Sequence, residues 1–267
     1  MNNNVFALMI RASQTFEVTP GNVVQSCHEV LALTGASPNR CFWGYSEGNA
    51  DKASRYYAKY DDFLPLVSTA KNVKSFYLIH GARISRKFEP IRHVCAFLGM
   101  EPWHINVVID EPNPYSFDAS QMAAISSCLA RSGIGIQKAI IKEFSGARNV
   151  NWFSFGVSSS SMSPEEKRRI ASRTKHYSEM DKKIWDVFWM NYFSAESLDV
   201  VGQEKVIRVF QENGFSLTKD GDNCILTAPI SSTDYIQNPA LFDEIKERTR
   251  AALRKESLLI YEEDIII

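Results

Sequence analysis

The pattern of hydrophobic positions predicts that strands and helices alternate in the N-terminal part of the chain. The run Val5–Arg11 barely alternates between apolar and polar residues, which is typical of a strand buried on both faces. Apolar residues at helical spacing then predict a helix over residues 21–34, which Gly35 ends. Cys41–Tyr45 and Ser75–His80 have the composition of two further strands.

A similar order of elements returns later in the chain. Ile105–Asp110 is the clearest buried strand, and Asp118 is placed to cap a helix over residues 119–132. Ile134–Phe144 and Asn151–Val157 come next as two strands that a short turn would pair. The order strand, helix, strand is therefore predicted twice.

Two helices are predicted from residues that begin, break or end helices. Asn49 or Asp51 can cap a helix that runs to about residue 69 and is broken near Pro65. The segment Phe88–Gly99 has a proline near its start and a glycine at its end, which favours a second helix.

The C-terminal part combines helices with one clear hairpin. We predict a helical stretch near residues 179–193, a helix over Gly202–Asn213 and a final amphipathic helix over Pro239–Lys255. Between the last two, Phe215–Lys219 and Cys224–Ala228 are predicted strands joined across Asp-Gly-Asp-Asn, which is a strong turn signal.

These elements together predict an α+β fold, with helices packed on a mixed α/β sheet. The repeated order around residues 5–45 and 105–144 leaves open two related halves, although few residues are identical between them. We expect a single compact domain over residues 1–267. If it is subdivided, the expected halves are residues 1–101 and 102–267.

Composition and charge exclude several classes of protein. The chain has 267 residues, of which 45% are hydrophobic, and 30 Lys+Arg stand against 31 Asp+Glu. It is too apolar and too balanced for intrinsic disorder, and it lacks the basic excess of a dedicated nucleic-acid binder. The charges are nevertheless segregated, with a net +3 over residues 164–183 and a net −3 over residues 234–267. Segregated charge favours a charged partner, but acids interrupt the basic stretch, so we expect no nucleic-acid partner.

Cysteine usage and targeting signals indicate a reduced, cytoplasmic compartment. The five cysteines are widely spaced and form no C-x-x-C pair, so neither a zinc knuckle nor a thioredoxin-type site is predicted. The N-terminal residues lack the pattern of a signal peptide, and no apolar run reaches the roughly 18 residues of a membrane span. We therefore expect a cytoplasmic protein with no membrane partner.

No motif in the sequence names a chemical reaction. Asp110 and Glu111 end a buried strand, as in a Walker B strand, but the sequence has no phosphate-binding loop. His28-Glu29 begins like a zinc motif, yet Ala32 stands where the second histidine is needed. We therefore predict a protein that is not an enzyme and binds no cofactor. The alternative is a small metal-dependent hydrolase or transferase that uses Asp110 and Glu111 as oxygen ligands.

Aromatic and acidic residues are concentrated between residues 42 and 62. Tyrosine and tryptophan beside carboxylates are typical of interface hot spots, although part of such a cluster packs in the core. The residues that we predict to bind a partner are Trp43, Tyr45, Glu47, Asp51, Tyr56, Tyr60, Asp61 and Asp62.

Three segments resemble a family of bacterial immunity proteins. Phe42–Ala53 (FWGYSEGNADKA) is similar to a tryptophan, glycine and alanine segment near the start of immunity proteins from polymorphic toxin systems, including type VI secretion and Rhs toxins. Trp189–Ser194 resembles a Trp-x-Asn-Tyr-x-Ser segment that precedes a short helix in those proteins. The order of helix, hairpin after Gly214, loop at Pro229 and amphipathic helix is similar as well.

The resemblance implies a cytoplasmic protein that binds one cognate toxin domain and occludes its active site. It covers most of the chain but leaves residues 81–104 and 158–183 unmatched, and it assigns no binding residue, because the toxin-contacting surface is the variable part of such families. Acidic side chains would then mimic a nucleic-acid or nucleotide substrate in a basic toxin cleft. The oligomeric state does not follow from the sequence.

Overall fold

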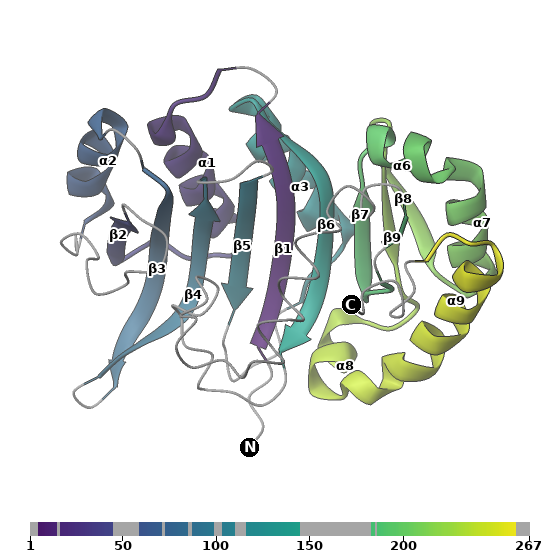
Figure 1. Ribbon diagram of the computed structural model, residues 1–267. Coiled ribbons are helices and arrows are strands. Elements are labelled where there is room, and N and C mark those ends of the chain that lie inside the picture. The colour runs from purple at the N-terminus through teal and green to yellow at the C-terminus, as the bar shows by residue number, and fades with distance from the viewer. Residues whose placement is uncertain are drawn as a thin grey trace, which may run out of the picture. The chain divides into compact units, whose positions relative to one another are not determined.

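The computed structural model describes residues 5–14, 17–44, 59–70, 73–84, 87–98, 103–109, 116–144, 183–184 and 186–259. Contacts between residues divide the chain into two compact units, Met1–Arg148 and Asn149–Ile267. Each unit combines an antiparallel sheet with helices (Figure 1), so the predicted α+β class is confirmed.

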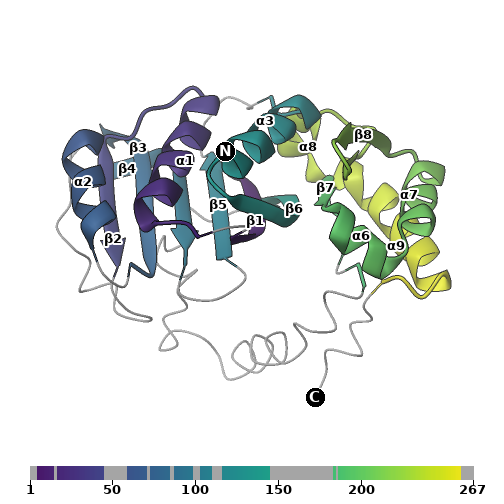
Figure 2. The ribbon, with the colours of Figure 1, turned by 90° about the horizontal axis from the view of Figure 1, so that it is seen from above.

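The first unit contains an open antiparallel sheet in the order β2-β3-β4-β5-β1-β6. Helices α1, α2 and α3 lie along one face of this sheet (Figure 2). The strands are β1 (Val5–Gln14), β2 (Arg40–Gly44), β3 (Ser75–Ile84), β4 (Lys87–Phe97), β5 (Trp103–Ile109) and β6 (Ile134–Phe144). The helices are α1 (Pro20–Leu33), α2 (Tyr60–Thr69) and α3 (Ala119–Arg131).

Strand β5 is buried on both faces of the sheet, as its sequence predicts. Successive side chains of a strand point to opposite faces, and every residue of Ile105–Ile109 is at most 7% exposed. The strand lies between β1 and β4 and forms no edge of the sheet. The apolar run therefore specifies a central position.

Side chains cap the starts of both α1 and α3, the second of them at the predicted Asp118. The side chain of Thr19 accepts a hydrogen bond from the backbone of Asn22 at the start of α1. Asp118 and Gln121 form a reciprocal capping box at the start of α3. Gly35 and Gly133 follow the helices with φ of +79° and +77°, a conformation that glycine adopts without strain.

Two of the predictions from proline are wrong. The segment predicted as a helix over Phe88–Gly99 is strand β4, and Pro90 lies opposite Gly81, where the register between β3 and β4 shifts. The bulge leaves Ile91 unpaired between Pro90 and Arg92, and the locally disrupted ladder tolerates a proline beside it. Pro65 does not break α2, which continues to Thr69. Its inner side is held by the fully buried Phe63 and Val67.

The second unit contains a three-stranded antiparallel sheet in the order β7-β9-β8. The predicted hairpin and the helices at Gly202–Asn213 and Pro239–Lys255 are confirmed, whereas Met190–Phe193 is a strand rather than part of a helix. The strands are β7 (Met190–Phe193), β8 (Ser216–Asp220) and β9 (Asn223–Thr227). The helices are α6 (Ala195–Val201), α7 (Gln203–Glu212), α8 (Ser232–Gln237), the 3-10 turn η2 (Pro239–Phe242) and α9 (Asp243–Lys255).

The Trp189–Ser194 segment has a structural role in the second unit. The indole of Trp189 donates to the carbonyl of Ile230 at 2.8 Å, and its ring stacks on Tyr235. The Asn191 amide donates to the carbonyl of Phe188 at 2.8 Å. Further aromatic contacts continue the core from Tyr235 through the rings of Phe242, Phe215, Phe210 and Phe193.

The last residues of this segment end β7 and begin α6. Tyr192 donates its hydroxyl to Asp220 at 3.3 Å. Ser194 caps α6 by accepting a hydrogen bond from the backbone of Ser197 at 3.2 Å. The short helix that the resemblance implies after this segment is therefore present.

The division into units differs from the predicted halves. Residues 103–109 and 134–144 pair with β1, so they belong to the first unit, and the boundary lies at residues 148 and 149 rather than 101 and 102. The single domain over residues 1–267 stays a prediction.

Helices α1 and α2 approach closely at Gly21, where a Cβ atom would overlap Oγ of Ser68. We predict that Gly21→Ala lowers the free energy of unfolding by about 1–3 kcal/mol through overpacking. In a Ser68→Ala background the same change should cost less than half as much, because the overlapping oxygen is absent. Urea unfolding of the four proteins measures this coupling, and equal costs in both backgrounds would contradict the contact.

His93 on β4 is 4% exposed, and burial lowers its pKa to about 3. His93 binds a proton near pH 6.5 in the unfolded chain, but only near pH 3 in the folded chain. The contribution of neutral His93 to the free energy of unfolding is therefore fully present above pH 6.5 and falls as the pH drops below that value. Between pH 7 and pH 5 we expect His93 to account for a loss of about 2 kcal/mol in the free energy of unfolding.

Urea unfolding at the two pH values tests this expectation on the native chain and on His93→Gln, which cannot titrate. The variant should lose less stability on acidification than the native chain. His28→Gln is the comparison variant, because His28 is only half-buried and burial lowers its pKa less than that of His93, so its replacement should prevent less of the acid loss. An unchanged acid loss in His93→Gln would rule out this role of His93.

Candidate partner-binding surface

The structure describes half of the residues that we predicted to bind a partner. Tyr60, Asp61 and Asp62 form the first turn of α2, and Trp43 lies in the edge strand β2. The remaining predicted residues lie outside the described part of the chain: Tyr45, Glu47, Asp51 and Tyr56. The binding role of the whole set stays a prediction.

Tyr60 packs between helices and is not a freely exposed anchor. Its ring stacks on the imidazole of His28 from α1, with the ring centroids 3.9 Å apart and the planes 12° from parallel. Its hydroxyl oxygen is buried and has no hydrogen-bond partner among the described residues. Burial raises the pKa of Tyr60, with further contributions from nearby Cys41 and Cys27. Tyr60 therefore fixes α2 against α1.

Asp61 and Asp62 are exposed at the start of α2. Lys59, the residue before the helix, makes no side-chain capping hydrogen bond, so the two carboxylates also compensate the positive end of the helix dipole. Neither carboxylate forms an ion pair with another described residue. Both charges are thus available to a partner.

The two carboxylates face different neighbours. Ser68 lies against α1 at Gly21, and Asp61 is two helical turns before it on the same side of α2. Asp62 precedes Leu66 by four residues, and Leu66 is 44% exposed. Asp62 and Leu66 therefore form a mixed acidic and apolar strip that turns away from α1.

His28 does not neutralise this acidic turn. Burial lowers the pKa of His28, and the opposing influence of Asp61 and Glu29 is smaller. The lowered pKa favours the neutral form of His28, which adds no positive charge beside Asp61.

Glu29 links α1 to α3. It forms an ion pair with Arg131 at 3.0 Å, and the thiol of Cys128 donates to the same carboxylate oxygen at 3.4 Å. Burial raises the pKa of Cys128 to about 12, and the carboxylate of Glu29 contributes to this increase. These contacts link α1 to α3. We call the residues His28, Tyr60, Asp61, Asp62 and Leu66 the α2 surface.

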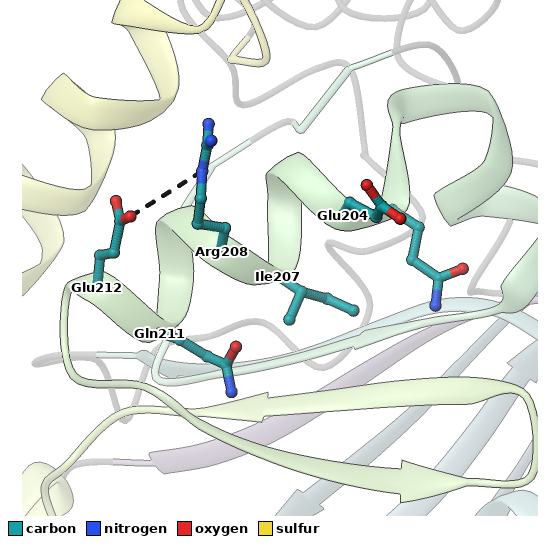
Figure 3. A pocket seen from close by; sticks show the side chains of 6 residues that line it. Glu204, Ile207, Arg208, Gln211 and Glu212 are labelled. Carbon is teal, nitrogen blue, oxygen red and sulfur yellow. Dashed lines mark ion pairs between the residues drawn. The ribbon is translucent and has the colours of Figure 1, made fainter.

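A second candidate is a concavity of about 570 Å³ along α7 (Figure 3). Arg208 lies 2.9 Å from Glu256 and 4.0 Å from Glu212, so its charge is compensated. Ile207 and Gln211 point to the other side of the helix. The concavity is lined by Gln203, Glu204, Ile207, Arg208, Gln211 and Glu212.

This concavity has the chemistry of a contact surface. The described residues that line it all come from one helix, and they include no cysteine, serine or histidine that could act as a nucleophile or base. Its amides and carboxylates can hydrogen-bond a polypeptide partner. The i, i+4 spacing of Glu204, Arg208 and Glu212 is the sequence signal that indicates this face of the helix.

The described residues contain no cluster that could hold a metal ion. No three His, Cys, Asp or Glu side chains gather there around a common point. All five cysteines are free and buried, and burial raises the pKa of Cys41 to about 12. Asp110 and Glu111 lie outside the described part of the chain, so the enzyme alternative stays a prediction. No helix in the described ranges is long and apolar enough to cross a membrane.

Comparison with known proteins finds similarity at the level of structure. No protein-family model and no curated protein sequence matches the chain. The Pseudomonas aeruginosa T6SS protein PA0821 is similar over 99% of this chain and 84% of its own, with 11% identity and a TM-score of 0.48. A chain from the complex of the toxic C-terminal tip of CdiA from Pseudomonas aeruginosa with its immune protein matches 57% of this chain and 90% of its own, with 8% identity and a TM-score of 0.26. Both TM-scores are below 0.5, so neither likeness carries an argument about function.

The buried hydroxyl of Tyr60 makes a distinctive prediction. Because an unpartnered buried hydroxyl costs free energy, Tyr60→Phe should leave the free energy of unfolding unchanged or raise it by up to about 1 kcal/mol. Tyr192→Phe is the matched control, since it removes the hydrogen bond to Asp220 and should destabilise by about 1 kcal/mol. Thermal or urea unfolding measures both, and a loss at Tyr60→Phe equal to that of the control would contradict this picture.

Proposed function

We propose that this chain is an immunity protein that binds a cognate toxin domain and neutralises it by occluding the toxin's active site. The observation that carries the proposal is the pair of exposed, adjacent carboxylates of Asp61 and Asp62 on the α2 surface, neither of them in an ion pair with a described residue. The proposed system is a polymorphic toxin system of the type VI secretion or Rhs kind, because the resembling segments occur in immunity proteins of those systems. The proposed place of action is the cytoplasm.

The architecture supports a binding role. In the part of the chain that resembles immunity proteins, Trp189, Asn191 and Ser194 are engaged in packing, hydrogen bonding and capping. Such a framework leaves the exposed faces of the helices free to contact a partner. On α2, the exposed side of Leu66 adds an apolar contact beside Asp62, which is the mixture that protein interfaces use.

Electrostatics indicate what kind of toxin surface would fit. Two neighbouring carboxylates attract a cleft lined by lysine and arginine, which is the surface that an enzyme acting on nucleic acids or nucleotides presents to its phosphate groups. Protection against a lethal enzyme requires a dissociation constant near nanomolar, or roughly −12 kcal/mol. Interfaces of that strength bury about 1,600 Å² in total, so the α2 surface would be one part of a larger contact.

The experiment reverses both charges, in Asp61→Lys/Asp62→Lys, and measures association with the C-terminal domain of the proposed cognate toxin. Charge reversal at the interface should lower the association rate at least about tenfold at low salt. Protection of cells that express the toxin domain should fall with it. Association at the native rate would remove the α2 surface from the interface, and failure of the native chain to bind would refute the immunity function itself.

The chain offers a matched control at the start of α9. Asp243 and Glu244 are likewise exposed, lie in the first turn of a helix and follow a residue without a side-chain capping bond. Asp243→Lys/Glu244→Lys therefore disturbs the helix dipole to the same degree, with a similar small loss of stability. It should leave association unchanged, so equal slowing by both variants would indicate a non-specific effect of net charge.

A further inference from the structure

The hairpin of the second unit brings a lysine amine against a cysteine sulfur. Nζ of Lys219 on β8 donates to Sγ of Cys224 on β9 at 3.1 Å. The two residues are directly paired across the strands. Cys224 is fully buried, whereas Lys219 is exposed, so the sulfur lies one flexible side chain beneath the solvent.

The backbone of the hairpin determines this contact. Asp220 pairs with Asn223 across the two-residue turn Gly221-Asp222, and Gly221 has the positive φ of +60° that such turns require. In a hairpin of this kind the pair next to the turn exchanges hydrogen bonds. The following pair, Lys219 and Cys224, is then the non-hydrogen-bonded one, in which the side chains are closest.

Cys224 also differs from the other four cysteines. Burial raises the pKa of all four, to about 12 for Cys41, Cys95 and Cys128. Within the described residues, none of these four sulfurs has an amine as its partner: Cys95 accepts from the Asn106 amide, and Cys128 donates to oxygen atoms. A lysine neighbour is one of the environments in which protein cysteines react as nucleophiles, and apolar burial is not.

We propose that Lys219 and Cys224 form a reversible sulfur–nitrogen cross-link when the protein meets a hydroperoxide. Hydrogen peroxide oxidises the Cys224 thiol to a sulfenic acid and is reduced to one water. The ammonium of Lys219 releases one proton to the solvent, and the free amine attacks the sulfenyl sulfur. An S–N bond forms, the S–O bond breaks, and the hydroxyl leaves as a second water with a proton from the nitrogen. Cys224 is oxidised by two electrons, and the product is a sulfenamide.

The cross-link would act on the edge of the sheet. Strand β8 has five residues and pairs with only one strand, β9, in the described structure. A covalent link beside the turn holds β8 in register with β9. A low-molecular-weight thiol reverses it by attacking the sulfur and releasing the lysine amine, so the link is a modification that responds to the redox state.

The test treats the folded full-length chain with dilute hydrogen peroxide, alkylates the remaining thiols after unfolding and digests the protein with trypsin. The expected product is about 2 Da lighter than the reduced chain, with Cys224 unalkylated, no cleavage after Lys219, and recovery of both on incubation with dithiothreitol. Cys27, Cys41, Cys95 and Cys128 serve as internal references and should be alkylated as in the untreated protein.

Two variants separate the cross-link from ordinary oxidation. Lys219→Arg keeps the positive charge but has no nucleophilic amine, so it should yield only sulfinic or sulfonic acid at Cys224 and a mass gain in place of the loss. Cys224→Ser should show no change in mass at this hairpin. Normal cleavage after Lys219 in the treated native chain, or oxidation products identical to those of Lys219→Arg, would overturn the proposal. Far-ultraviolet circular dichroism of each variant establishes that the second unit is folded.

Discussion

The burial of strand β5 on both faces is the constraint on which the first unit depends. A strand whose side chains are apolar on both sides must lie between other strands and beneath a cover, and β5 lies between β1 and β4. Helices α1 and α3 lie over one face of that sheet. The close approach of α1 to α2 at Gly21 and the stacking of His28 on Tyr60 then place the first turn of α2. The position of Asp61 and Asp62 is therefore a consequence of how the sheet is covered.

In the second unit, a row of aromatic rings has the corresponding role. It begins at Trp189 and runs through α8, η2 and α7 to β7, so that elements far apart in the sequence share one core. The short segments that resemble immunity proteins belong to this framework. Packing residues constrain the fold and leave the outer faces of the helices free to vary. A motif of a few packing residues can therefore indicate a class of protein without indicating what that protein binds.

The two acidic helix starts show why local sequence does not identify a binding surface. Asp61-Asp62 and Asp243-Glu244 both lie in the first turn of a helix, and the helix dipole favours acids at both. Their helices differ in the residues beyond the first turn. On α9, Lys246 and Arg250 contact Asp186, and Arg250 also pairs with Glu247. Helix α2 contains no lysine or arginine, so its negative charge is uncompensated along the helix. The environment of the pair, and not the pair itself, favours a role in binding.

The sequence by itself determined the elements whose signals are local. The capped helices at Thr19 and Asp118, the Asp-Gly-Asp-Asn hairpin and the run Ile105–Ile109 follow from hydrogen bonding, turn geometry and apolar patterning within a few residues. Phe88–Gly99 failed as a helix because its proline is accommodated in a strand beside a bulge at Ile91, which only strand pairing creates.

Contacts between distant residues were decided by the tertiary structure alone. Tyr60 could be assigned neither to the core nor to the surface before His28 was seen to stack on it, and nothing in the sequence relates two residues 32 positions apart. The contact between Lys219 and Cys224 depends on both local sequence and tertiary structure. The turn sets the register of the two strands, whereas burial of the sulfur depends on the packed sheet. Hydrogen bonds and turns act over short distances along the chain, whereas burial is a property of the whole fold.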